Sequence, residues 1–207
     1  MFFSHDTFFI FLLINIPNTA AISFMQNLSG TVLRVFDFMI IDFGAKCLQA
    51  SVFHMEAQKR LQYLSHASTH EISGDEIDDI LLKHFEPFVR EAWQKKQDPL
   101  QNSLISDGGQ NKFYQSTIQN LRNTVHQLKT QTNTSTGLSG TVTLVPFDED
   151  IEVKMTLAEF ESLVHKNLEQ WVQSTLETAI NKASEKFGNL NLQYVRRTGG
   201  SSLLPLF

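Results

Sequence analysis

Residues 32–41, VLRVFDFMII, together with the following Asp42, Phe43 and Gly44, decide the fold assignment of this chain. The stretch is rich in β-branched and aromatic side chains, which favour a buried β-strand. Gly44 predicts a short turn after it, because glycine tolerates backbone conformations that other residues avoid. Residues 48–55 and 61–66 have the same character. The sequence therefore predicts a meander of three strands.

Helices and loops follow the meander. Capping-box patterns, a Ser or Thr followed three residues later by Glu, predict helix starts at Ser73 and Thr156. Apolar residues at helical spacing continue these helices to about Lys96 and Phe187, and a third helix is predicted over 111–131. The polar, glycine-containing segments 97–110 and 132–140 are predicted to be loops or linkers.

Strands complete the pattern. Residues 141–146 and 151–155 flank an acidic turn and predict an antiparallel hairpin. Residues 192–195 predict another strand, followed by the loop 199–202. The expected fold is α/β: a mixed sheet with flanking helices, plus a smaller hairpin-and-helix subdomain.

Composition narrows the function classes only slightly. The chain has 207 residues, a formal net charge of −5 and no long basic run, which argues against a nucleic-acid partner. One cysteine, Cys47, excludes an internal disulfide and a zinc site built from several cysteines. The low charged fraction of 19% and the 17 phenylalanines argue against disorder.

The N-terminal apolar run, residues 8–14, leaves two interpretations open. It is too short for a transmembrane helix, which needs about 20 residues. Its length fits the hydrophobic region of a signal peptide, but no Lys or Arg precedes it, which favours a buried strand. A cytoplasmic location is therefore favoured, and the endoplasmic reticulum is the expectation if the run is a signal peptide.

Three stretches share one physical character, a short turn containing glycine beside a strand. They are residues 41–45, 73–75 and 198–201. Backbone amides can approach a phosphate at such turns because glycine has no side chain. Each turn alone is a weak signal, and their order along the chain is the stronger one.

Further segments of the chain resemble known motifs, and they occur in the same order as those motifs. Residues 15–21 resemble Asn-Glu-Pro-Thr-Ala-Ala-Ala, and residues 42–49 resemble a phosphate loop, Asp-x-Gly-Gly-Gly-Thr-x-Asp. Residues 72–78 resemble Leu-Gly-Gly-Glu-Asp-Phe-Asp, with His84 and Phe85 following at the matching positions.

The second half of the chain contains more motif matches in the same order. Leu121, Arg122 and Lys129 match a Leu-Arg…Glu-x-x-Lys helix, residues 156–161 match Thr-Arg-x-x-Phe-Glu, and residues 195–205 match Val-x-x-x-Gly-Gly-Ser-x-x-x-Pro. Together these motifs resemble the ATPase domain of the heat-shock protein 70 family, within the actin-like superfamily. The resemblance covers nearly the whole chain and implies a ribonuclease-H-like actin-like lobe, the second lobe of a nucleotide-binding domain.

The resemblance implies a set of site residues. Asp42 corresponds to the carboxylate that serves catalysis and holds magnesium through its waters. The implied cofactors are ATP or ADP with magnesium, and the implied partners are other chaperones or nucleotide-exchange factors. The implied nucleotide-binding residues are Gly44, Ala45, Lys46, Cys47, Gly74, Lys129, Gly199, Gly200 and Ser201.

Several positions depart from the family pattern. Ile16 replaces the Glu of the connecting segment, Ala45 and Lys46 replace two glycines of the phosphate loop, Cys47 replaces its Thr and Gln49 its second Asp. A β-carbon at each former glycine narrows the approach of phosphates, although Lys46 offers a positive charge.

The adenosine-binding positions depart as well. His126, Thr130 and Asn133 replace the family's Glu, Arg and Ser, and Leu203 replaces the Arg that stacks on adenine. Compared with the ATPase domain of the family, which has two lobes, residues 1–207 are expected to form a partial nucleotide-binding domain that lacks the first lobe.

These departures set the functional expectation. Phosphoryl transfer requires charge stabilisation from several sides, so hydrolysis by this chain alone is not expected. The first reading is a divergent chaperone ATPase fragment in which adenine-nucleotide binding is weak or lost. The alternatives are a non-catalytic protein-interaction module and a truncated relic of a chaperone ATPase domain.

Overall fold

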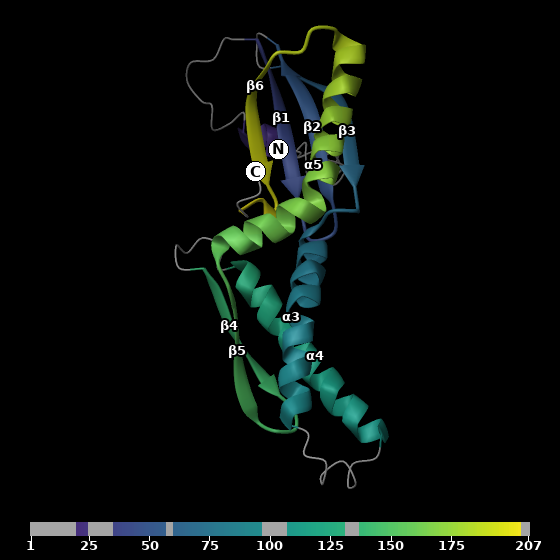
Figure 1. Cartoon of the computed structure of the whole chain (residues 1–207). Helices are drawn as coiled ribbons and strands as arrows, with labels where there is room; N and C mark the ends of the chain where they lie inside the picture. The colour runs from purple at the N-terminus through teal and green to yellow at the C-terminus, as the bar shows by residue number, and fades with distance from the viewer. Residues whose placement is uncertain (1–19, 25–34, 57–59, 97–106, 131–136, 204–207) are drawn as a thin grey trace, which may run out of the picture. The chain divides into compact units, whose positions relative to one another are not determined.

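The computed structural model of the chain describes residues 20–24, 35–56, 60–96, 107–130 and 137–203 (Figure 1). The chain divides into two compact units. The first comprises Met1–Ser73 and Gln170–Ser202, and the second comprises Gly74–Glu169 and Leu203–Phe207. The apolar run 8–14 lies outside the described residues, as does the connecting segment up to Thr19.

A mixed four-stranded sheet forms the centre of the first unit. Its strands are β1 (Phe36–Phe43), β2 (Leu48–Met55), β3 (Leu61–Thr69) and β6 (Leu192–Thr198). They lie in the order β3-β2-β1-β6, so β6 and β3 are the two edges (Figure 1). β1 pairs antiparallel with β2 and parallel with β6, and β2 pairs antiparallel with β3.

The position of β1 inside the sheet follows from its composition. All eight of its residues are buried, as expected for a strand that is covered on both faces. A helical turn at 20–24 contributes to one face, where Ala21 and Phe24 pack with Phe36, Phe38 and Phe53. This aromatic cluster forms a large part of the hydrophobic core of the unit.

The C-terminal half of helix α5 (Leu157–Phe187) packs on the strands β2 and β3. The Ser65 hydroxyl donates a hydrogen bond to the Ala179 carbonyl, and Lys186 Nζ donates to the Leu64 carbonyl at 3.5 Å. The Phe187 ring lies 4.4 Å from the His54 ring, centroid to centroid. These contacts fix this half of α5 over the β2–β3 side of the sheet.

The second unit contains two helices and a hairpin. Helices α3 (Gly74–Lys96) and α4 (Asp107–Thr130) pack against one another, and the strands β4 (Leu138–Leu144) and β5 (Glu149–Met155) pair antiparallel. The first half of α5 belongs to this unit. Its start is fixed by a capping box, in which the Thr156 backbone amide donates to Glu159 Oε2 at 2.7 Å and the Glu159 amide donates to Thr156 Oγ1 at 3.2 Å.

Polar side chains of α4 bind the backbone of the hairpin. Thr124 Oγ1 donates to the Thr141 carbonyl at 2.8 Å, and Asn120 Nδ2 donates to the Thr143 carbonyl at 3.0 Å. The Val145 amide donates to Thr117 Oγ1 at 2.9 Å. These side chains satisfy backbone groups that an exposed strand edge leaves free.

The mixed α/β fold with a mixed sheet and flanking helices confirms the expected class, while several element bounds differ. α4 begins at Asp107, so the last residues of the expected loop 97–110 are helical, and residues 97–106 lie outside the described part. β4 begins at Leu138, inside the expected linker 132–140, of which residues 132–136 are not described. Packing against α4 explains the difference, since Leu138 is 1% exposed despite its polar neighbours in sequence.

The two tryptophans differ in their burial. Trp93 and Trp171 occupy apolar positions at helical spacing, which predicts that both lie in the core. Trp93 is 7% exposed, and its indole N–H donates to the Val145 carbonyl at 2.7 Å. Trp171 is 41% exposed, so the expectation for it is wrong. The buried side chains of α5 become smaller along the helix: after Leu168 they are Thr175, Ala179 and Ala183.

Candidate functional site

The carboxyl ends of β1 and β6 lie side by side at one end of the strands in the sheet of the first unit. The two strands are parallel, and the register places Asp42 opposite Thr198. Their following turns, at Gly44 and at Gly199, therefore leave the sheet on the same side. In open α/β sheets, ligands bind outside the carboxyl ends of the strands. The carboxyl ends of β1 and β6, with the turns that follow them, are the candidate site of the first unit.

Gly199 brings the two turns into close contact. Its φ is +88°, and a Cβ built on it would lie 2.6 Å from Asp42 Oδ1 and would also overlap the Phe43 carbonyl. Any other residue would be strained in backbone conformation and would collide with the end of β1. The chain therefore requires glycine here so that its backbone can pass directly beside the Asp42 carboxylate.

The Asp42 side chain is buried at the end of β1, where 9% of the residue is exposed. Burial raises the pKa of Asp42 above its ordinary value of 3.8. Burial disfavours the ionised form of a carboxylate, and a cation close to it favours that form. The role of Asp42 toward magnesium stays a prediction.

The turn after β1 is closed on itself. The Gly44 amide donates to the Cys47 carbonyl at 3.0 Å, so this amide is used within the turn. The side chains of Ala45 and Lys46 are exposed, and Gln49 Nε2 donates to Cys47 Sγ at 3.2 Å. Of the residues expected to hold phosphates here, Lys46 has the exposed charge.

The turn after β6 continues into the short 3₁₀-helix η2 (Gly200–Leu203). Gly200 is exposed, and a Cβ on it would meet nothing within 4 Å. Ser201 is 5% exposed. The two adjacent glycines therefore differ, because contact with β1 restricts Gly199 and leaves Gly200 open.

Gly74 and Lys129, the other predicted binding residues, lie together in the second unit. Gly74 is the first residue of α3, and Lys129 lies in the last turn of α4. Lys129 Nζ donates to the Gly74 carbonyl at 2.8 Å and lies 2.8 Å from Asp78 Oδ1. His126 Nδ1 lies 3.1 Å from the other carboxylate oxygen of Asp78. Lys129 thus links α4 to the first turn of α3, and its role toward nucleotide stays a prediction.

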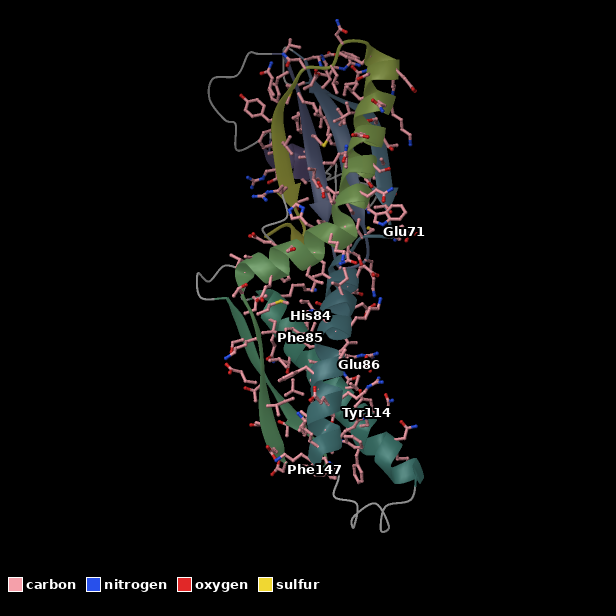
Figure 2. All side chains as sticks on the ribbon, in the orientation of Figure 1. Glu71, His84, Phe85, Glu86, Tyr114 and Phe147 are labelled. Atoms are coloured by element: carbon pink, nitrogen blue, oxygen red, sulfur yellow. The ribbon has the colours of Figure 1, made fainter. Side chains whose placement is uncertain are left out.

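A depression of about 330 Å³ lies beside this ion pair in the second unit. Its lining combines three carboxylates with one guanidinium and two apolar side chains: Asp75, Asp78, Asp79, Leu82, Arg122 and Val125. Further along α3, Arg90 donates to Glu86 Oε1 at 2.6 Å and to the Tyr114 hydroxyl at 3.1 Å. Figure 2 labels Glu86 and Tyr114, which link α3 to α4, together with His84 and Phe85 of the sequence motif.

Sequence reasoning missed a buried polar group in the first unit. His54 Nδ1 and Asp37 Oδ1 are 2.7 Å apart across β1 and β2, and Asp37 Oδ2 accepts a hydrogen bond from the Asn191 amide at 2.8 Å. Asp37 and His54 are 6% and 9% exposed. The group ties the chain before β6 to the sheet. No spacing signal could have identified it, because the residues meet only through strand register.

Two other kinds of site, a direct metal site and a membrane-spanning helix, were looked for among the described residues. Among them, no three His, Cys, Asp or Glu side chains gather in a way that could hold a metal ion directly. Within the same part of the chain, no helix has the length and apolar character that crossing a membrane requires. A metal at Asp42 would accordingly need further ligands from water and from a bound phosphate.

No family model matches the chain, and no curated protein matches its sequence.

Proposed function

We propose that this chain is a divergent heat-shock protein 70-like lobe that binds adenine nucleotide weakly and does not hydrolyse ATP by itself. The observation that carries the proposal is the contact between Gly199 and Asp42 at the carboxyl ends of two parallel strands. The mixed sheet is compatible with the ribonuclease-H-like sheet expected of an actin-like lobe.

The proposed site places different chemistry in its two turns. The backbone at Gly200 gives a phosphate or a nucleoside close access, because this exposed residue has no side chain and nothing lies within 4 Å of the position of its missing Cβ. Asp42 would hold magnesium through its water molecules, and the bound ion would neutralise phosphate charge. Lys46 adds an exposed positive charge at the opposite turn.

The turn after β1 explains the proposed weakness. Ala45 and Lys46 carry β-carbons where the resembling motif has glycines, and the Gly44 amide is used within the turn. Cys47 and Gln49 also replace an oxygen-bearing Thr and Asp of that motif. One carboxylate and a narrowed loop do not surround a phosphoryl group with convergent charge, so hydrolysis is not part of the proposal.

Calorimetry with magnesium-ADP tests the proposal. We expect a dissociation constant near the millimolar range for the whole chain, with binding that weakens when magnesium is removed. Asp42→Asn should abolish the dependence on magnesium. Lys154→Ala, at an exposed position of the second unit, should leave the titration unchanged. The absence of heat at millimolar nucleotide would reject the proposal and favour the protein-interaction module.

Two substitutions at one position test the steric argument. Ala45→Gly should strengthen binding severalfold, because it removes a β-carbon and retains the charge of Lys46. Ala45→Val should weaken binding by a similar factor. Equal affinities for both variants would show that the turn after β1 does not contact the nucleotide.

Location and partners extend the proposal. We propose a cytoplasmic location, with the endoplasmic reticulum as the alternative if residues 8–14 form a signal peptide, and we expect the chain to contact another chaperone or a nucleotide-exchange factor. Co-purification of the tagged full chain with such a protein would test the partner, and loss of that contact in excess magnesium-ADP would connect it to the site.

A further inference from the structure

His70 holds the turn after β1 from outside that turn. Its ring nitrogen Nδ1 lies 3.2 Å from the Lys46 carbonyl oxygen, although the two residues are 24 positions apart in the sequence. A carbonyl oxygen only accepts hydrogen bonds, so Nδ1 carries the proton and donates it. Within the turn, the Gly44 amide donates to the Cys47 carbonyl at 3.0 Å. The turn is therefore fixed both from within and by the residue that follows β3.

The sheet determines the position of His70. Thr69, the last residue of β3, pairs with Leu48 at the start of β2, so His70 comes directly beside the turn that precedes β2. The Glu71 amide donates to Thr69 Oγ1 at 3.1 Å, which fixes the backbone on the other side of His70. Ordered backbone on both sides of His70 thus brings its ring to the Lys46 carbonyl.

The hydrogen bond from His70 orients the peptide group between Lys46 and Cys47. The one cis peptide bond among the described residues lies in the second unit, so the peptide 46–47 is trans. In a planar trans peptide, the C=O and N–H groups point in opposite directions. Because the Lys46 carbonyl faces the end of β3, the Cys47 N–H faces away from it. The strand order β3-β2-β1-β6 places β1 and the turn at Gly199 on that side.

We propose that His70 is a positioning residue for phosphate: it holds the Cys47 backbone N–H toward the candidate site, where this group donates a hydrogen bond to a phosphate oxygen of the nucleotide. This inference rests on the proposed function. A backbone donor does not depend on its side chain, so the cysteine at position 47 is compatible with the role. His70 acts through Cys47 and does not itself contact the ligand.

The thiol of Cys47 gives a measurement that does not depend on nucleotide, because Cys47 is the only cysteine of the chain. In the full chain, the Cys47 thiolate attacks a chromogenic aromatic disulfide and releases a coloured thiolate, which reports the rate. His70→Ala should raise this rate about threefold or more, since the turn opens more often without its outer hydrogen bond.

Two further variants control this measurement. His70→Asn should keep the wild-type rate, because the asparagine Nδ2 carries a donor close to the position of the histidine Nδ1. His165→Ala, at an exposed position of the second unit, is the matched control and should also leave the rate unchanged.

Ligand-observed NMR titrations with magnesium-ADP and with adenosine test the link to phosphate. His70→Ala should weaken the binding of magnesium-ADP about threefold to tenfold, as expected for one hydrogen bond, and should leave adenosine binding unchanged. His70→Asn should restore the affinity for magnesium-ADP. A merely structural role of His70 would weaken the binding of both ligands alike.

The outcomes separate this inference from the proposed function. If the wild-type chain binds no nucleotide, the proposed function is wrong, and the role of His70 toward phosphate is wrong with it. If the wild-type chain binds magnesium-ADP and His70→Ala binds it equally well, only the role of His70 is wrong. An unchanged rate of Cys47 modification in His70→Ala, or no rescue by His70→Asn, would also overturn the inference.

Discussion

Two neighbouring glycines show how a single residue controls the candidate site. Gly199 has a positive φ and would place a Cβ against Asp42 and the Phe43 carbonyl, whereas a Cβ on Gly200 meets nothing within 4 Å. The two residues have the same intrinsic flexibility, and only their surroundings differ. Their difference can therefore be measured directly.

We predict that Gly199→Ala lowers the free energy of unfolding by about 1–3 kcal/mol, because it forces a residue with a Cβ into a strained conformation. Gly200→Ala should cause a much smaller change. Urea unfolding followed by circular dichroism measures both variants. Equal effects would mean that the backbone of β6 does not approach β1 as described.

The Asp42 carboxyl predicts a pH dependence at the residue scale. Its folded pKa is raised by burial above the ordinary 3.8, so the folded chain binds its proton more tightly than the unfolded chain does. The resulting stabilisation is present below pH 3.8 and is lost as the pH rises through the folded pKa. Asp42→Asn removes this ionisation.

We therefore expect Asp42→Asn to be more stable than the wild-type chain at neutral pH, with the difference growing as the pH rises through the folded pKa and then becoming constant. Urea midpoints measured from pH 3 to pH 8 would show this. A variant less stable than wild type at neutral pH would mean that the ionised carboxylate has a favourable partner.

At the scale of elements, helix starts are encoded locally and helix contacts are not. The Thr156–Glu159 capping box is visible in the sequence and forms in the structure, and its hydrogen bonds hold the pKa of Glu159 below its ordinary value. The link between α3 and α4 instead depends on Lys129 and Asp78, whose side chains are 12% and 23% exposed. No local pattern announces that pair.

We predict that Lys129→Ala lowers the free energy of unfolding by about 1–3 kcal/mol, because it leaves the largely buried Asp78 carboxylate without its cation. Lys95→Ala is the matched control: Lys95 pairs with Glu91 within α3, where both side chains are mostly exposed, and its loss should change the urea midpoint little. The double variant Asp78→Ala/Lys129→Ala should cost less than the sum of its single variants. Simple additivity would argue against the pair.

At the scale of the whole molecule, each of the two units contains fully buried side chains. Phe38, Phe43 and Phe53 are fully buried in the first, and Leu128 and Phe160 are fully buried in the second. Compact units of one chain can differ in the free energy at which they open.

Tryptophan fluorescence can distinguish the units, because Trp93 is buried in the second unit and Trp171 is half-exposed in the first. In a Trp171→Phe background, Gly199→Ala should shift the urea midpoint seen by circular dichroism more than the midpoint seen by Trp93 fluorescence. Equal shifts would indicate that the chain unfolds as one cooperative unit.

Much of the fold could be predicted from particular residues. The meander followed from the apolar runs around Ile40 and Val52, and the long helices followed from their caps and apolar spacing. The first turn of α4 and the start of β4 were missed, because polar composition dominated segments whose structure depends on tertiary contacts. At the site, the glycine turns were visible in the sequence. The closed turn at Gly44, the engagement of Lys129 and the Asp37–His54 pair were not.

The sequence by itself determined the elements, because caps, turns and hydrophobic periodicity act over a few neighbouring residues. It also determined the types of side chain available: one cysteine, a modest acidic charge and glycines after two strands. Only the tertiary structure decided which glycine is indispensable, which carboxylate lies buried beside it and which of the described strands lie at the two edges of the sheet. Those properties arise from strand register and from the approach of segments distant in sequence, where steric overlap and desolvation depend on neighbours that no local pattern specifies.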